Sequence, residues 1–415
     1  MNRKALSVIA IITVIVLIAA VVTHRSRQAD SDVTSSADLL LPQLASHLND
    51  IDTIKLTSAG QKEIATFKRG VKGWLLANRS DYPADAAKLR EFVLKLSDAK
   101  TIEAKTENPD LYSKLGVEDV TASNAAGVLV ELDGLPQKTA VIIGNVNGGG
   151  GGGTFVRRMG DEQSWLIAGT LTVDHNASDW IAREIADIPS SRIRVVVIEK
   201  DGQTLRISKP VGSDGNFVID DIPSGRKPTT EFAANGLGAA LAGLRIDDVT
   251  AAAQMPAPAD AIKAQYLTVN GIRVDATAWT ASDKHYAQFK ASIDDATANQ
   301  WIGMEQARQD AAHQAAVADT SIPVVAKPEA APTETVAPDA APTKPLALTE
   351  PAKDRDEKRA AIKEEVDRLN AAFNGWTFTL PAYKFDNINQ GMDDLLLPVD
   401  DSKTTSAKPA KPNRK

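Results

Sequence analysis

Apolar residues follow three patterns along this chain: one continuous run, several alternating segments and a few helical stripes. The continuous run is Ala5–Val22, which has no charged residue. A helix of this length spans about 27 Å, close to the thickness of a bilayer core. A cleaved signal peptide is the alternative, but its apolar core is shorter and is followed at once by small residues. We therefore predict an uncleaved transmembrane anchor in residues 1–23 and a polar linker in residues 24–38.

Basic residues lie on both sides of the apolar run, so charge sets its orientation only weakly. Arg3 and Lys4 precede the run, and Arg25 and Arg27 follow it. A very short tail before a single span favours an outward-facing body. We therefore predict a single-pass protein of the bacterial inner membrane, in contact with its lipid, with the C-terminal body in the periplasm. The absence of cysteine fits an oxidising compartment in which no disulfide is needed.

Short apolar segments after the linker predict a first α+β module in residues 39–188. One helix should begin after Asp85, because apolar residues then follow at helical spacing from Leu89 to Leu96. Trp180 to Ile188 should form a short connecting helix. Strands are expected at Ile54–Leu56, Ile64–Phe67, Trp74–Leu76, 127–132, 140–143, 154–158 and 164–168.

The same landmarks recur in residues 189–321, in the same order and at nearly the same offset. This predicts a duplicated module made of an antiparallel meander sheet with packed helices; two unrelated meanders with common turns are the alternative. The turn at Gly60-Gln61 is matched by Gly202-Gln203, Trp74–Leu76 by Phe217–Ile219, Leu89, Val93 and Leu96 by Leu237, Leu241 and Leu244, and Asp133-Gly134 by Asn270-Gly271.

The last quarter of the chain alternates between folded and unfolded patterns. Residues 296–318 are helical, and residues 322–351 are too rich in proline to form a core, so they predict a disordered insert. Residues 352–401 predict a helix and a strand that return to the second module, and residues 402–415 predict a disordered tail. The expected fold class is α+β: a single N-terminal transmembrane helix followed by two similar α+β modules.

The charge balance argues against nucleic acid as a partner. The chain has 47 basic and 54 acidic residues, which gives a net charge of −7. A nucleic-acid-binding protein needs a basic face to neutralise phosphates.

No residues stand at the spacing of a known catalytic, cofactor or metal site. The five histidines are isolated, and no His-Glu-x-x-His or Gly-x-Ser-x-Gly sequence occurs. The six glycines Gly148–Gly153 lead into a strand-like segment and lack the Lys-Ser/Thr of a phosphate loop. They predict a flexible hairpin loop. We therefore expect no enzyme activity, no cofactor and no metal.

Acidic pairs, an arginine pair and several tryptophans are weaker candidates. Most acidic pairs stand where helix starts or turns are expected, so capping of backbone amides is favoured over acid–base catalysis. Arg157-Arg158 could bind an anion, but alternation in a strand places the two on opposite faces. Trp74, Trp165 and Trp376 are expected in the core. The acidic pairs are Asp220-Asp221, Asp247-Asp248, Asp294-Asp295, Asp393-Asp394 and Asp400-Asp401.

Several landmarks together resemble a bacterial domain-of-unknown-function family. Its members are membrane-anchored envelope proteins associated with gliding-motility-type ABC transporters. The similar landmarks span residues 40–320 and include Gly73–Leu76, Tyr82–Asp85, Leu111–Gly116, Ile143-Gly144 and Thr154–Arg158; Asn374–Tyr383 is similar to the usual ending. The six-glycine loop and the proline-rich insert depart from the pattern.

The resemblance implies a non-catalytic, membrane-anchored periplasmic subunit that assists an ABC-type export system, with the permease and ATPase subunits as partners. It carries over no catalytic residue. The alternative is a periplasmic module that binds or scaffolds a cell-envelope polysaccharide or peptide, because duplicated modules often create a cleft. An envelope hydrolase is the third and weakest hypothesis.

Overall fold

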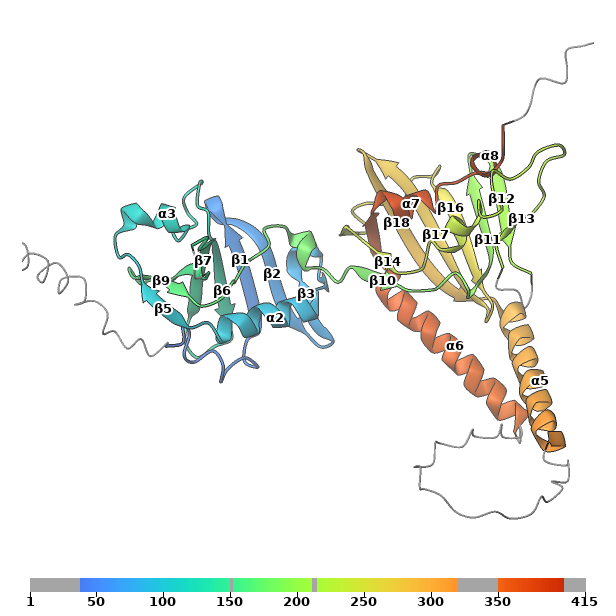
Figure 1. Cartoon of the computed structure of the whole chain (residues 1–415), viewed down its shortest axis with the longest axis horizontal. Helices are drawn as coiled ribbons and strands as arrows, with labels where there is room; N and C mark the ends of the chain where they lie inside the picture. Colours follow the sequence, from blue (N-terminus) through green and yellow to red (C-terminus); the bar gives the residue numbers. More distant parts are fainter. Residues whose placement is uncertain (1–37, 150–151, 211–214, 320–349, 399–415) are drawn as a thin grey trace, which may run out of the picture. The chain divides into compact units, whose positions relative to one another are not determined.

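A computed structural model describes residues 38–149, 152–210, 215–319 and 350–398. The chain divides between Ile181 and Ala182 into two compact units. Each unit is built on one large antiparallel sheet, drawn in blue to green for the first unit and in green to red for the second (Figure 1).

The first unit is a nine-stranded sheet with the order β4-β3-β2-β1-β6-β7-β8-β9-β5. Short 3₁₀ turns η1 (Ala59–Gln61), η2 (Ala77–Arg79), η3 (Pro109–Leu111) and η4 (Ala177–Trp180) and helices α2 (Ala86–Ser97) and α3 (Tyr112–Leu115) connect the strands. The strands are β1 (Thr53–Ser58), β2 (Lys62–Gly70), β3 (Gly73–Leu76), β4 (Tyr82–Pro83), β5 (Thr101–Ala104), β6 (Val128–Asp133), β7 (Thr139–Val146), β8 (Thr154–Arg158) and β9 (Ser164–Ile167).

Helix α2 covers one face of this sheet, which we call its helix face (Figure 1). The carboxylate of Asp85 accepts a hydrogen bond from the backbone amide of Lys88 and caps the helix, as the sequence predicts. Trp180 is 1% exposed. Its ring lies 5.4 Å from that of Phe67 on β2 and 5.7 Å from that of Phe92 on α2. This edge-to-face set joins the helix to the sheet.

The second unit has an eight-stranded sheet with the order β13-β12-β11-β16-β17-β18-β19-β15 and a small ribbon of β10 and β14. Its helices are α4 (Asn235–Gly238), α5 (Asp295–Asp319), α6 (Pro351–Phe373), α7 (Ala382–Asp386) and α8 (Met392–Leu395). The strands are β10 (Glu184–Ala186), β11 (Ile193–Lys200), β12 (Gln203–Ser208), β13 (Val218–Ile219), β14 (Leu244–Arg245), β15 (Asp248–Ala251), β16 (Ile262–Thr268), β17 (Ile272–Ala281), β18 (Lys284–Ile293) and β19 (Trp376–Leu380).

The strand order of the second sheet repeats that of the first. The run β3-β2-β1-β6-β7-β8-β9-β5 in the first unit corresponds strand by strand to β13-β12-β11-β16-β17-β18-β19-β15 in the second. The matched sequence landmarks occupy equivalent places, because Gly60 and Gly202 lie in the turns β1–β2 and β11–β12, and Gly134 and Gly271 lie in the turns β6–β7 and β16–β17. The shared order places the same turns at the same corners of both sheets.

Helix α6 packs on the helix face of the second sheet. Phe373 at its end lies 5.4 Å, ring to ring, from Phe289 on β18. The amide side chain of Asn370 donates to the carbonyl of Ala291 and accepts from the amide of the same residue. Both helices of the pair α5 and α6 extend away from the sheet (Figure 1). Gln306 on α5 donates to the carbonyl oxygen of Pro351 on α6 at 2.7 Å.

The expected fold class, α+β with a single N-terminal transmembrane helix before two α+β modules, is wrong. The described chain consists mostly of antiparallel sheet with a few helices. Among its residues no helix has both the length and the apolar character needed to cross a membrane. The anchor expected in residues 1–23 lies outside the described residues.

Two expected helices account for part of this error. Residues Trp180–Ile188 form the end of η4 and the strand β10 instead of a connecting helix. The apolar stripe from Leu237 to Leu244 is reduced to the short α4, because glycines at 236, 238 and 243 disfavour a longer helix. Almost all of the linker (24–38) and of the proline-rich insert (322–351), and the whole tail (402–415), also lie outside the described residues.

Candidate functional site

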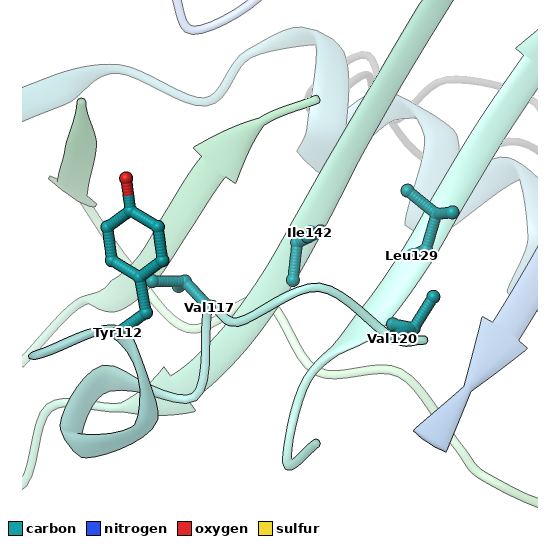
Figure 2. Close-up of a cluster of buried hydrophobic side chains, with 5 residues drawn as sticks. All are labelled: Tyr112, Val117, Val120, Leu129 and Ile142. Carbon is teal, nitrogen blue, oxygen red and sulfur yellow. The ribbon is translucent and has the colours of Figure 1, made fainter. Parts of the chain in front are cut away.

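The two sheets differ in how their second face, which we call the loop face, is covered. In the first unit the connection between β5 and β6, residues 105–127, lies over β6 to β8. Tyr112, Val117 and Val120 from this connection meet Leu129 on β6 and Ile142 on β7 in one buried cluster (Figure 2). This part of the loop face is therefore closed by apolar contacts.

Arg157 on β8 holds the connection in place. Its side chain is 6% exposed. It donates to the carbonyl of Val117 at 2.9 Å and to the carboxylate of Asp119 at 2.8 Å. The guanidinium carbon also lies 4.6 Å from the ring centre of Tyr112. Burial raises the pKa of the Tyr112 hydroxyl, and the charge of Arg157 partly opposes that rise.

The equivalent connection in the second unit, residues 252–261 between β15 and β16, is shorter. It is fixed through the carbonyl of Met255, which accepts hydrogen bonds from Thr377 at 2.7 Å and from Gln288 at 3.4 Å. Beside it lies a cavity of about 350 Å³, which we call the notch. The notch is lined by Ala252, Asp275, Thr277, Gln288, Phe289, Lys290, Phe373, Asn374, Gly375 and Trp376.

The notch exists because β19 leaves β18 early. The pairing of the two strands runs only from His285 to Ala287 on β18. Farther along, the edge of β18 is met at Ala291 by the side chain of Asn370 from α6. Gly375 adopts a φ of +88°, a left-handed conformation that suits glycine, where the chain turns from α6 into β19. The stretch of β18 between these two contacts borders the cavity.

Charged groups of opposite sign lie side by side on the wall of the notch. Asp275 and Lys290 are direct cross-strand partners on β17 and β18. One carboxylate oxygen of Asp275, Oδ2, accepts from Arg273 at 3.2 Å. The other, Oδ1, is buried and has no hydrogen-bond partner within the described residues. Oδ1 is closed to solvent, as is Nε of Arg273, which also has no partner among the described residues. The Asp275 side chain as a whole is 30% exposed, so a group in the notch can reach only the rest of the carboxylate.

A second cavity, of about 290 Å³, lies in the first unit beside the β6–β7 and β8–β9 turns. Its wall includes the buried leucines Leu41 and Leu44 and the cationic side chains of Lys138 and Arg158. Arg158 is already engaged, because its Nε donates to the carbonyl of Leu40 at 2.7 Å. We therefore regard the notch as the stronger candidate site.

Five residues of the predicted acidic pairs are caps or ion-pair partners in the structure. Asp294 accepts from the amide of Thr297 at the start of α5, and these hydrogen bonds hold the pKa of its carboxyl below the usual value. Asp394 accepts from the amide of Gly391. Asp220 pairs with Arg206, Asp295 with Arg359, and Asp393 with Arg226, whereas Asp400-Asp401 lie outside the described residues.

The prediction that Arg157 and Arg158 point to opposite faces is confirmed. Arg157 binds the connection on the loop face, and Arg158 binds Leu40 on the other side of the strand. The prediction of three core tryptophans is wrong. Trp74, Trp165 and Trp376 are all only half-buried, and Trp376 lines the notch.

Sequence reasoning missed the residues of the notch. Asp275, Gln288 and Lys290 stand at alternating polar positions of β17 and β18, a pattern that is also typical of an ordinary solvent-facing side. The sequence marked this region only through Trp376, as an expected core residue, and through the resemblance of Asn374–Tyr383 to a family ending. Nothing in the linear pattern shows that β19 stops pairing with β18 beside these side chains.

Two histidines have defined neighbours, and neither is arranged as a metal ligand. His47 lies 2.6 Å from a carboxylate oxygen of Asp50, and His285 stacks on Phe385. In the part of the chain that the structure describes, no group of three or more histidine, aspartate or glutamate side chains could hold a metal ion.

The chain matches one known protein family. The family described as "Domain of unknown function (DUF4340)" matches residues 74–292, more than half of the chain. Nothing in this match links the chain to gliding-motility-type ABC transporters. Among curated proteins and among solved structures, nothing matches.

Proposed function

We propose that this chain, which belongs to the DUF4340 family, is a non-catalytic binding subunit whose second unit captures a small polar ligand in the notch. The observation that carries the proposal is the difference between two sheets of the same strand order. One has a loop face closed by a buried cluster and Arg157, and the other leaves a cavity lined by several polar side chains, among them Asp275 and Lys290. Cavities of this size with a few polar groups are typical of ligand sites.

The acidic side chains support a binding role over a catalytic one. General acid–base work needs carboxylates that are free to exchange a proton with a substrate. Asp294 and Asp394 instead cap helices, and Asp220, Asp295 and Asp393 are ion-paired.

We further propose that this subunit works beside an ABC-type transporter at the bacterial inner membrane and presents its ligand to the transport path. Support comes from the sequence landmarks of the resemblance, several of which fall within the matched residues 74–292, including Leu111–Gly116 and Thr154–Arg158. Isolation of the full chain from native membranes in mild detergent should bring down an ATPase and a permease subunit. Their absence would contradict the transporter association and leave ligand binding open.

Ligand binding is tested by native mass spectrometry of the same preparations. Thr277→Phe places a bulky ring in the notch, whereas Thr204→Phe makes the same change at an exposed position on β12. We expect a bound small molecule on the wild-type chain and on Thr204→Phe, and none on Thr277→Phe. An identical ligand mass on all three chains would count against the notch as the binding site.

A further inference from the structure

The lining of the notch indicates which class of ligand it takes. Resting on the binding function proposed above, we propose that the notch binds a short, uncharged, hydroxyl-rich saccharide. The evidence is the set of polar groups on its wall, their charges and the aromatic rings beside them.

The carboxylate of Asp275 offers an acceptor to a ligand in the notch. Its side chain is 30% exposed, and Arg273 donates to Oδ2 at 3.2 Å and fixes the direction of the carboxylate. A sugar hydroxyl is a donor that brings no charge of its own. A charge-assisted hydrogen bond to a carboxylate is also about twice as strong as a neutral one.

The charges of the notch disfavour an ionic ligand. Asp275 and Lys290 are direct cross-strand partners, so an anion would lie beside the carboxylate and a cation beside the ammonium group. Each hydroxyl of a saccharide both donates and accepts. It can therefore donate to Asp275 and accept from Lys290 without meeting a like charge.

Amide and aromatic groups complete the match. Asn374 offers an amide donor and acceptor, and Thr277 adds a hydroxyl, whereas the amide nitrogen of Gln288 already donates to Met255 and Thr377. The half-buried Trp376 gives an apolar surface on which the C–H groups of a sugar ring can pack. The volume of about 350 Å³ lies at the lower end of the range for small-ligand sites, which favours one or two rings over a longer chain.

Isothermal titration of the full chain tests this proposal with three uncharged probes, maltotriose, cellotriose and chitotriose, and with triglycine as a zwitterionic peptide probe. We expect binding of at least one saccharide. The variant Asp275→Asn should weaken it about tenfold or more, because a charged acceptor is replaced by a neutral one. The matched control Asp283→Asn, an exposed aspartate in the turn at the far end of the same two strands, should bind like the wild type.

Thermal unfolding of each variant checks that the fold is retained. If Asp275→Asn unfolds, Asn374→Ala on the opposite wall provides the second reading and should also weaken saccharide binding. Absence of saccharide binding, or saccharide binding that neither notch variant changes, overturns the proposal. Binding of triglycine alone, lost in Asp275→Asn, would overturn the saccharide assignment and support the binding function itself.

Discussion

Replacing Arg157 by methionine tests how the loop face of the first unit is closed. The variant leaves the carbonyl of the fully buried Val117 without its donor, at a cost of about 1–3 kcal/mol. It also removes the cation over the Tyr112 ring, worth about 0.5–2 kcal/mol. The pair with Asp119 adds only about 0–1 kcal/mol, because that carboxylate is 56% exposed. The free energy of unfolding should therefore fall by about 1.5–6 kcal/mol.

Hydrogen exchange of the full chain localises this loss. A cost of 2 kcal/mol corresponds to about 30-fold faster exchange, and we expect it in residues 105–127 and in the strand amides beneath them. Arg308→Met is the matched control, because its side chain is 80% exposed and pairs with Glu305 at 3.4 Å. It should change the free energy of unfolding by less than about 0.5 kcal/mol. Wild-type exchange rates in residues 105–127 of Arg157→Met would refute the role of Arg157 in holding this connection.

Three further substitutions test the fold and its ionisation. Gly271→Ala should lower the thermal unfolding midpoint more than Gly202→Ala. Both glycines have a positive φ, so alanine at either position costs about 1–2 kcal/mol in backbone strain, but a Cβ at 271 would in addition meet the backbone of α5 at 2.5 Å, whereas a Cβ at 202 would meet nothing within 4 Å. Equal midpoints would contradict this expectation. Asp294→Ala should lose about 0.5–2 kcal/mol of capping energy. Hydrogen bonds lower the pKa of Asp294 below 3.8. The difference in free energy of unfolding between the wild type and Asp294→Ala should therefore be present above pH 3.8 and vanish as pH falls through the folded-state pKa, which urea titrations at several pH values would show. Burial lowers the pKa of Lys384 below 10.5, so its buried charge destabilises the fold at neutral pH. This destabilisation is lost as pH rises through the folded-state pKa. The urea midpoint of the wild type should therefore rise relative to that of Lys384→Met in alkaline buffer.

Local patterns in the sequence predicted much of the sheet structure. The alternation around Ile54 and Phe67 and the turn at Asp133-Gly134 mark real strands and a real hairpin, because burial of one face forces a period of two. The recurrence of these landmarks corresponds to two sheets with one strand order. Helical content was overestimated where glycines interrupt apolar residues at helical spacing, as at Gly236 and Gly238. Apolar residues at this spacing can also lie in an irregular buried connection.

The candidate site could not be predicted in the same way. It depends on where β19 stops pairing with β18 and on how short the connection 252–261 is, and both are properties of strand pairing over long sequence separations. Asp275 has the sequence context of a surface residue in a half-buried strand. Its unpaired oxygen is a feature of the folded structure alone.

The most direct test of the central claim is a hydrogen-exchange footprint of the full chain with and without saturating maltotriose, cellotriose or chitotriose. If the notch is the binding site, at least one saccharide should slow exchange in β17, in β18 and in residues 373–377, and the exchange of residues 105–127 in the first unit should stay unchanged. Unchanged exchange around the notch with all three saccharides, or protection confined to the first unit, would contradict the account.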